Sequence, residues 1–421
     1  MAKAADRVPL LFLSTQLRPI AEAQKMRNVI LKDFLHEVEF VTTTSQQAAT
    51  LINQQMMGST HAADVVGALH GELQPLAQLN ALLPLDALVQ KQSTRSVPAS
   101  LLALGKVGTA HQLYMPWMQA GYVMVANKKA LPYLSKEAEL DRLSYSQLAA
   151  WASEIQQRTG KRLLGFPAGP QGLMHRFIQG FLYPSFTGGV VRSFRTIEAE
   201  AMWVQLASLW KSVNPNSTSY NFMSPPLLSD EVWIGFEHIA RIVDVLRQKP
   251  GEFIAFPAPS GPRGRGYMPV VAGLAVLKTA AAADSATGLI EHLLSREAQL
   301  ATLRSAGFLP VIETELPQDA EPGSKMATAV IAKLQSAEDA VPTSIPLGLG
   351  ERADDFNKVF MDTFQLIVLR GENPRAVLDQ QAEILSRLMA EAGAPCWQPD
   401  AVTADPCQPE LRRDPLPDRS H

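Results

Sequence analysis

Cysteine is scarce in this chain of 421 residues, which contains only Cys396 and Cys407. Neither belongs to a C-x2-C pattern, and the eight histidines show no metal-binding spacing, so we expect no metal and no cofactor. The two cysteines lie close together in a proline-rich C-terminal tail. They are either two surface thiols or, as we favour, a disulfide that holds the tail in an oxidising compartment.

Long apolar runs and an excess of one charge are also missing. No run approaches the roughly 20 residues needed to span a bilayer. The net charge is -3, which gives no general electrostatic reason to bind nucleic acid, and we expect no nucleic-acid partner. The apolar segment from Pro9 to Leu13 is too short for a signal-peptide core. The protein is therefore either cytosolic or numbered from behind a removed signal.

Catalytic signatures are absent as well. The sequence has no G-x-S-x-G elbow, no H-E-x-x-H motif and no kinase-like set, and no glycine-rich phosphate loop follows a predicted strand. No pair of carboxylates of the kind that glycosidases use can be singled out. We therefore expect a protein that is not an enzyme, with a soluble α/β enzyme as an alternative.

The first seventy residues alternate between strand-like and helix-like segments. Strands are predicted by "VPLLFLST", "VEFVTTT" and "ADVVGAL", and helices by "RPIAEAQKMRNVILKDF" and "QQAATLINQQMM". This alternation predicts an α/β layer with a parallel sheet. In such sheets, ligands bind at the carboxyl ends of the strands.

Polar residues follow each of these three strands. The candidate binding residues are Ser14, Thr15 and Gln16, then Thr44 and Ser45, then His70 and Gly71. Each group is equally compatible with an ordinary strand-to-helix turn or a helix cap, and His70 with a buried structural imidazole. Their recurrence at three strand ends favours a binding rim.

Further along, "QLYMPWMQAGYVMVANKKAL" predicts two extended stretches around residues 119–121, where small residues allow a hinge-like bend. The segment "LSYSQLAAWASEIQQRTG" predicts a helix capped by Ser144. The segment "NPRAVLDQQAEILSRLMAEAG" predicts a helix with Asn373 as its cap and Gly393 as its stop. Between these two helices, "GFLPVIETELP" predicts a short extended crossing.

The segment "SDEVWIGFEHIARIVDVLRQ" predicts a helix capped by Ser229. Trp233, Glu237 and Arg241 recur at i, i+4 and i+8, so they are expected on one helical face. Trp233 could then be a stacking platform, with Glu237 and Arg241 pairing hydroxyl groups. The alternative is a surface Glu–Arg pair that contributes little.

The order of these segments resembles the extracellular solute-binding proteins of family 1, the maltose-binding-protein-like receptors of sugar ABC importers. The matching pieces cover nearly the whole chain: "ADVVGALHGELQPLAQLNALLPLDALV", "YMPWMQAGYVMVANKKAL", "LSYSQLAAWASEIQ", "FTGGVV", "SREAQLATLRSAGFLPVI" and "LRGENPRAVLDQQAEIL". The departures are Tyr145 where the family prefers tryptophan, the less polar "PWMQAGY", and the long proline-rich tail with its two cysteines.

This resemblance implies a periplasmic-binding-protein-like type II fold, with two α/β lobes, a multi-strand hinge and a central ligand cleft. Residues 1–118 and 271–311 would form the N-terminal lobe, and residues 119–270 and 312–393 the C-terminal lobe. Residues 394–421 would form the tail. The segment "GFLPVI" would be the last crossing between the lobes.

The resemblance also implies a solute site between the lobes. Sugars are recognised by flat aromatic faces and by polar groups that pair with hydroxyls. Beside the strand-end residues, the candidates are Trp117, Gln119, Gln171, Arg176, Trp233, Glu237, Arg241, Tyr267 and Arg352. For Arg176 the alternative is a solvated charge on a helix.

The implied function is the capture of a carbohydrate or sugar derivative and its delivery to the membrane permease subunits of an ABC importer. The receptor would be a monomer in the periplasm or outside the cell, and a removed N-terminal signal could have tethered it to the membrane. One alternative is the same fold binding a phosphorylated polyol or other anionic solute, held by Arg176, Arg241 and Arg352.

Overall fold

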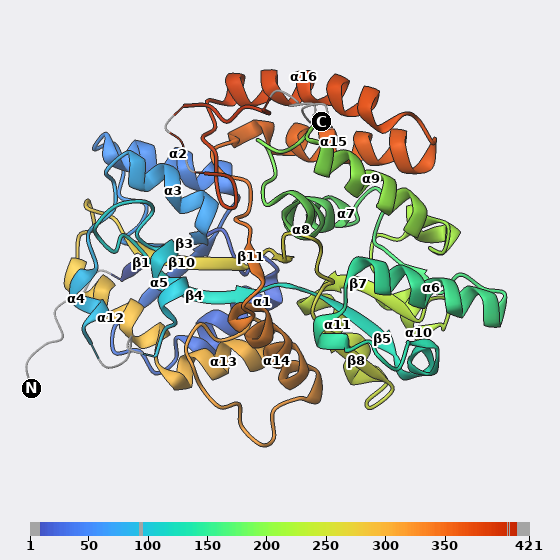
Figure 1. Ribbon diagram of the computed structural model, residues 1–421. Coiled ribbons are helices and arrows are strands. Elements are labelled where there is room, and N and C mark those ends of the chain that lie inside the picture. The colour runs from blue at the N-terminus through green and yellow to red at the C-terminus, as the bar shows by residue number, and fades with distance from the viewer. Residues whose placement is uncertain (1–8, 92–95, 402, 404, 411–421) are drawn as a thin grey trace, which may run out of the picture. The chain divides into compact units, whose positions relative to one another are not determined.

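The computed structural model describes residues 9–91, 96–401, 403 and 405–410 (Figure 1). The chain divides into two compact units, and it passes between them three times. Unit 1 comprises Met1–Ala120 and Val270–Ala320, and unit 2 comprises Gly121–Pro269 and Glu321–His421. The lobe boundaries expected from the sequence stay a prediction.

Unit 1 is built on a mixed five-stranded sheet in the order β2-β1-β3-β10-β4. Strands β2, β1 and β3 are parallel, whereas β10 runs antiparallel to both of its neighbours. The strands are β1 (Leu10–Ser14), β2 (Val38–Thr42), β3 (Val65–Leu69), β4 (Met115–Ala120) and β10 (Val270–Val276). The β-α-β-α-β order predicted for the first seventy residues is confirmed.

Helices cover both faces of this sheet. Successive strand residues point to opposite faces, so neighbouring residues report on different faces. Phe12 and Val65 belong to one apolar cluster, and their neighbours Leu13 and Val66 belong to another. Both faces are therefore buried, as the continuous apolar strands require. The helices are α1 (Ile20–Lys25), α2 (Ser45–Met56), α3 (His70–Gln78), α4 (Asp86–Val89), α5 (Ala99–Leu104), α12 (Ala283–Leu293) and α13 (Arg296–Ala306).

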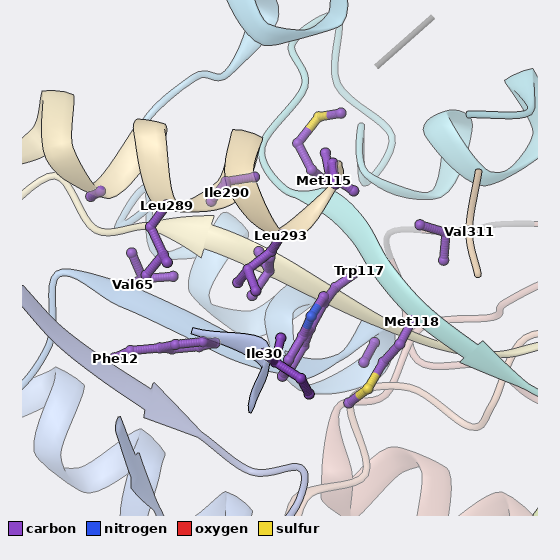
Figure 2. Close-up of a cluster of buried hydrophobic side chains, with 14 of the residues drawn as sticks. Phe12, Ile30, Val65, Met115, Trp117, Met118, Leu289, Ile290, Leu293 and Val311 are labelled. Carbon is purple, nitrogen blue, oxygen red and sulfur yellow. The ribbon is translucent and has the colours of Figure 1, made fainter. Parts of the chain in front are cut away.

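The larger of the two clusters packs α1, α5 and α12 against the sheet (Figure 2). Trp117 is fully buried at its centre, with its ring centroid 5.5 Å from that of Phe12. Val311 also belongs to this cluster, and Leu309 forms an antiparallel bridge with Gln119. The expected crossing at Gly307–Pro317 is therefore packed within unit 1, and the chain enters unit 2 only after Ala320.

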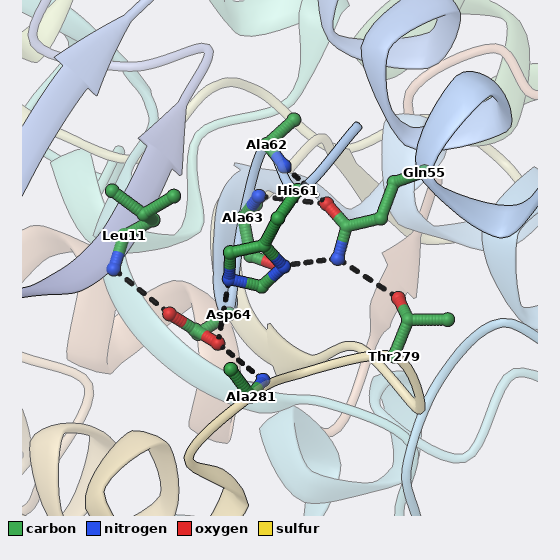
Figure 3. Close-up of polar contacts among 8 residues, drawn as sticks. All are labelled: Leu11, Gln55, His61, Ala62, Ala63, Asp64, Thr279 and Ala281. Atoms are coloured by element: carbon green, nitrogen blue, oxygen red, sulfur yellow. Dashed lines mark hydrogen bonds and ion pairs between the residues drawn. The ribbon is translucent and has the colours of Figure 1, made fainter. Parts of the chain in front are cut away.

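A buried polar cluster ties the amino-terminal edge of the unit 1 sheet together (Figure 3). The Asp64 carboxylate accepts hydrogen bonds from the Leu11 N–H (2.9 Å) and the Ala281 N–H (2.7 Å). The Gln55 side chain accepts from the Ala63 N–H (2.8 Å) and donates to the Ala63 carbonyl (2.7 Å). These bonds join β1, the approach to β3 and the loop after β10.

Unit 2 contains a four-stranded sheet in the order β6-β7-β5-β8 and a separate parallel pair, β9 and β11. Strands β6 and β7 are parallel, and β5 runs antiparallel to β7 and β8. The strands are β5 (Tyr122–Asn127), β6 (Leu164–Gly165), β7 (Ile234–His238), β8 (Phe253–Phe256), β9 (Arg265–Tyr267) and β11 (Ala340–Pro342).

Two of the predicted unit 2 helices begin and end where the sequence indicated. Ser144 caps its helix through a capping box with Gln147, and Asn373 accepts from the Ala376 N–H before Gly393 ends the helix in a left-handed conformation. The helices are α6 (Tyr145–Thr159), α7 (Met174–Phe177), α8 (Tyr183–Thr187), α9 (Ile197–Trp210), α10 (Ser224–Leu228), α11 (Ile239–Gln248), α14 (Pro322–Ser336), α15 (Ala353–Phe364) and α16 (Pro374–Ala392). A π-helical turn, Ile178–Leu182, joins α7 to α8.

The single helix predicted across residues 229–248 is wrong. Ser229 follows the last residue of α10, and residues 234–238 form β7 before α11 begins at Ile239. Strand β7 pairs with β5 on one side and β6 on the other. Pairing with distant strands therefore overrides a local helical spacing of apolar residues.

Residues 394–401, 403 and 405–410, here called the C-terminal strap, pack on the rest of unit 2. Cys396 and Cys407 form a disulfide with their Cα atoms 4.6 Å apart. Between them, Trp397 is buried against Phe356. The buried Asp400 carboxylate accepts hydrogen bonds from the N–H groups of Val190 (3.0 Å) and Val191 (2.8 Å). The strap thus supplies a charged acceptor to the turn between α8 and α9.

Candidate functional site

The carboxyl ends of β1 and β3 in unit 1 are joined by a short polar network. The Ser14 hydroxyl donates to the Gly67 carbonyl (3.1 Å) and accepts from the Gln16 N–H (3.0 Å). The Thr15 hydroxyl donates to the Glu72 carboxylate (2.6 Å), which also accepts from the Leu69 N–H (2.8 Å). The predicted residues at these two strand ends do lie together. Glu72, which organises them, was not among the candidates.

Ser14 and Thr15 are buried, and their side chains make the bonds that shape this edge. Gln16 is half-buried, and its amide donates to the Thr15 hydroxyl (2.9 Å). After the neighbouring strand β2, Thr44 and Ser45 are exposed, and the Thr44 hydroxyl accepts from the Gln47 N–H (3.3 Å). Thr44 is therefore the N-cap of α2.

His70 begins α3 directly after β3, and its Nδ1 is hydrogen-bonded to the hydroxyl of Tyr114. Burial lowers the pKa of His70 to about 4, so the imidazole is neutral at physiological pH. Burial raises the pKa of the Tyr114 hydroxyl. Gly71, the next residue of α3, is half-buried.

The two candidates on β4 point into packed protein. Trp117 lies in the core of unit 1 (Figure 2), and its carbonyl accepts from the Gln299 amide (2.7 Å). Gln119 is buried, and its amide donates to the Pro310 carbonyl (2.7 Å). The structure contradicts the expectation that these side chains face a cleft. Strand β4 is buried on both of its faces.

A second polar cluster lies at the carboxyl end of β7 in unit 2. The Glu237 side chain is fully buried and accepts from the N–H groups of Met223 (2.9 Å) and His238 (2.7 Å). Arg241 Nη1 lies 3.5 Å from Glu237 Oε1. Burial raises the pKa of the Glu237 carboxyl, and the two backbone hydrogen bonds and Arg241 oppose that shift.

Aromatic groups surround this ion pair. The guanidinium carbon of Arg241 lies 4.4 Å from the centre of the Phe222 ring, a cation–π arrangement. Phe222 is 45% exposed, and Tyr122 is buried and stacked on Phe236 with ring centroids 5.6 Å apart. Phe222 was missed in the sequence because it belongs to a loop without a periodic pattern.

Arg176 on α7 adds a second guanidinium group to this cluster. Arg176, Glu237 and Arg241 are all close enough to act electrostatically on the Tyr122 hydroxyl, whose pKa is raised mainly by burial. Arg176 Nη1 is buried and has no hydrogen-bond partner within the described residues. Burial and a neighbouring arginine lower the pKa of His175 to about 3 and of His238 to about 4, so both imidazoles are neutral.

Two further candidates lie in other surroundings. Trp233 precedes β7 at the end of the strand opposite to Glu237, and its ring lies against Tyr133. The expected shared helical face of Trp233, Glu237 and Arg241 is therefore wrong, because a strand separates Trp233 from the ion pair. Arg352 is exposed and paired with Asp355 (3.1 Å) and Glu391 (2.7 Å).

Gln171 and Tyr267 complete the predicted set. The Gln171 N–H donates to the Asn221 side chain (2.9 Å), so the loop before α7 is bonded to the residue that precedes Phe222. Tyr267 is nearly buried on β9, and burial raises its pKa. Its carbonyl accepts from the Thr343 N–H (2.9 Å).

No three potential metal ligands gather anywhere in residues 9–91, 96–401, 403 and 405–410. Within that same described part of the chain, no helix combines the length and apolar character needed to cross a membrane. The chemistry that the two polar edges offer is hydrogen bonding, charge and aromatic contact.

Comparison with known families identifies the chain. A model of the bacterial extracellular solute-binding proteins matches residues 21–300. The chain belongs to this family. The family model does not extend over α14, α15, α16 and the C-terminal strap of this solute-binding protein. Comparison with curated proteins gave no match.

Solved structures show the same fold at low sequence identity. Maltose-bound MalE3 of T. maritima is 17% identical with a TM-score of 0.66, over 91% of this chain and 100% of that one. The sugar-binding protein MalE of Xanthomonas citri is 14% identical with a TM-score of 0.72, over 91% and 98%. UgpB of Mycobacterium tuberculosis, in complex with glycerophosphocholine, is 16% identical with a TM-score of 0.67, over 91% and 99%. The predicted type II binding-protein fold is confirmed.

Proposed function

We propose that this solute-binding protein is the receptor of an ABC importer and that it captures a carbohydrate or sugar derivative for the permease subunits. The observation that carries the proposal is the Glu237–Arg241 pair beside the exposed Phe222 ring. The Arg241 guanidinium, whose side chain is 30% exposed beside the buried Glu237, can pair with sugar hydroxyls, and the Phe222 ring can cover an apolar sugar face. Within unit 1, the polar edge at His70 and Thr15 offers further hydrogen-bonding groups.

The solved relatives support a sugar. MalE3 of T. maritima holds maltose, and the Xanthomonas citri relative is a sugar-binding protein. We further propose that the protein works as a monomer, without turnover of its solute, in the periplasm or outside the cell. The family is extracellular, and the Cys396–Cys407 disulfide suits an oxidising compartment.

Calorimetric titration with a panel of mono- and oligosaccharides tests the proposal. We expect one or more sugars to bind, and Phe222→Ala to weaken that binding about tenfold through loss of aromatic contact, or about 1.4 kcal/mol. Leu369→Ala is the matched control, because Leu369 is similarly exposed in unit 2 at 42%. Failure of every sugar to bind, with tight binding of another class of solute, would overturn the carbohydrate assignment.

A second candidate is an anionic solute, and the charges of unit 2 favour it specifically. Two guanidinium groups, Arg176 and Arg241, and one carboxylate, Glu237, act electrostatically on the Tyr122 hydroxyl, and the neighbouring imidazoles are neutral. Arg176 Nη1 also lacks a hydrogen-bond partner within the described residues. The relative UgpB is known in complex with glycerophosphocholine, whose phosphodiester would satisfy such a surplus of positive charge.

The same titration separates the two candidates when glycerophosphodiesters join the panel. An anionic solute should lose affinity as salt rises, and Arg176→Gln should weaken it far more than Arg142→Gln, since Arg142 is highly exposed. Binding of a neutral sugar should not depend on the salt concentration. Salt-independent binding that survives Arg176→Gln would exclude the anionic candidate.

A further inference from the structure

We propose that Tyr114 is a positioning residue that holds His70 as the neutral tautomer protonated on Nε2, so that His70 presents a fixed hydrogen-bond donor to an oxygen of the solute. The inference rests on the proposed function and deepens it, because it requires that the solute place an acceptor oxygen at His70. Hydroxyl, ether, carboxylate and phosphate oxygens all meet that requirement.

The hydrogen bond between the two side chains fixes which nitrogen carries the proton. The Tyr114 side chain is fully buried, and within the described residues its hydroxyl bonds only to His70 Nδ1. If Nδ1 donated to the phenol oxygen, the phenol O–H would be left buried without an acceptor, at a cost of about 1–3 kcal/mol. The phenol therefore donates, Nδ1 accepts, and the remaining proton resides on Nε2.

Both partners are held in their neutral forms. Burial lowers the pKa of His70 to about 4 and raises that of Tyr114. His70 is also the first residue of α3, where the helix dipole disfavours a cation. Glu72, on the same helix, is already occupied by the Thr15 hydroxyl and the Leu69 N–H. The pair thus remains neutral across the physiological pH range.

Tyr114 is well suited to position its partner because its ring is clamped. Gly273 on β10 gives the ring its space: a Cβ at this position would lie 2.2 Å from Tyr114 Cδ2. The Gln112 amide donates to the Tyr114 carbonyl (2.8 Å), which holds the backbone beside the ring. His70, by contrast, is half-buried at the edge where β3 ends. A fixed phenol therefore orients an imidazole at the polar edge of unit 1.

Nitrogen-15 NMR of the imidazole rings in the intact protein tests the assignment, with His70→Gln identifying the His70 signals. We expect a neutral ring with the proton on Nε2 and an Nδ1 resonance displaced by an accepted hydrogen bond, unchanged between about pH 5.5 and 8. Tyr114→Phe keeps the ring in the core and should abolish that displacement. The matched control is Tyr183→Phe, since the buried Tyr183 hydroxyl donates to the Phe194 carbonyl in unit 2.

A proton on Nδ1, or a charged His70 at about pH 6, would overturn the inference whatever the protein binds. The second measurement is the affinity of Tyr114→Phe for the solute found by titration. We expect about a five- to tenfold loss, as for one misplaced hydrogen bond of about 1–1.4 kcal/mol. Wild-type affinity in a variant that has lost the Nδ1 signature would refute the role in recognition. If no solute binds, the proposed function fails while the tautomer remains open to test by NMR.

Discussion

The Glu237 carboxylate uses both of its oxygens for contacts within the protein. Both of its oxygens are occupied, Oε2 by the Met223 N–H and Oε1 by the His238 N–H and the nearby Arg241. Its sequence neighbourhood had suggested a carboxylate free to pair with a ligand. The structure shows a carboxylate that holds the backbone at Met223, directly after Phe222, and that lies beside Arg241, which is the more accessible of the two.

The buried carboxyl of Glu237 makes stability depend on pH. Burial raises the pKa of this carboxyl in the folded protein above its ordinary value of 4.5, so the folded state binds the proton more tightly than the unfolded chain. The contribution of Glu237 to the free energy of unfolding therefore rises as pH falls towards 4.5 and declines as pH rises through the folded pKa. Glu237→Gln removes this titration.

Urea unfolding at about pH 5 and about pH 7.5 measures the effect. We expect the free energy of unfolding of the wild type, relative to Glu237→Gln, to be larger at the lower pH. Glu137→Gln is the control because Glu137 is exposed on the same unit. A difference that is constant, or that grows with rising pH, would contradict the raised pKa.

Single residues also show the limit of reading a site from sequence. Trp117 and Gln119 lie on β4, in which every side chain is buried. The sequence of this strand therefore does not indicate which side chain faces a ligand. Ser14, Thr15 and His70 were predictable because they follow strands whose carboxyl ends meet at one edge. Tyr122 stacks on Phe236 only through the pairing of β5 with β7, which local patterns do not encode.

At the scale of elements, helices with strong end signals were predicted well. The capping box of α6 and the Asn373 cap with Gly393 stop of α16 are local chemistry, so the sequence alone specifies them. The segment that became β7 and α11 lacked such a signal at their junction. Its apolar residues fit a helical spacing as well as a strand followed by a helix, and only pairing with β5 and β6 decides between them.

The C-terminal strap is an element whose contribution to stability can be separated into parts. Asp400→Asn weakens the acceptor for the Val190 and Val191 N–H groups, which should cost about 1–3 kcal/mol. Asp405→Asn, at an exposed position of the same strap, should stay within about 0.5 kcal/mol. Replacing Cys396 and Cys407 by Ser should cost about 3 kcal/mol, since it opens a short covalent loop.

Urea unfolding of these three variants, and of Asp400→Asn combined with the two Cys→Ser changes, measures these effects. Hydrogen exchange at Val190 and Val191 complements it. The cost of Asp400→Asn should be smaller in the Cys396→Ser/Cys407→Ser background, because a strap that is no longer closed docks less firmly. Unchanged exchange protection at Val190 and Val191 in Asp400→Asn would show that the strap does not hold that turn.

At the scale of the whole molecule, the discontinuity of unit 1 is the dominant feature. Its sheet takes β1, β2, β3 and β4 from the first 120 residues, but β10, from residues 270–276, lies between β3 and β4. Without β10, strand β4 has no partner in the sheet, and Tyr114 loses the backbone against which it packs. The two halves of unit 1 are therefore expected to fold only together.

Circular dichroism and urea unfolding of two shortened chains test this dependence. Residues 1–120 alone should lack a cooperative transition. Residues 1–120 joined to 270–320 by a short Gly/Ser linker should unfold cooperatively, because the sheet is then complete. A cooperative, folded 1–120 fragment would show that β10 is dispensable for the first unit.

The late arrival of β10 has a consequence for the proposed location outside the cytoplasm. A polypeptide secreted amino end first threads its leading segments through a narrow channel, which only an open chain can pass. The first 120 residues are expected to lack a complete sheet until β10, which ends at Val276, has been made. During the early part of export they would therefore remain an open chain. In the proposed location, the sheet would be completed on the far side of the membrane, where Cys396 and Cys407 can also be oxidised.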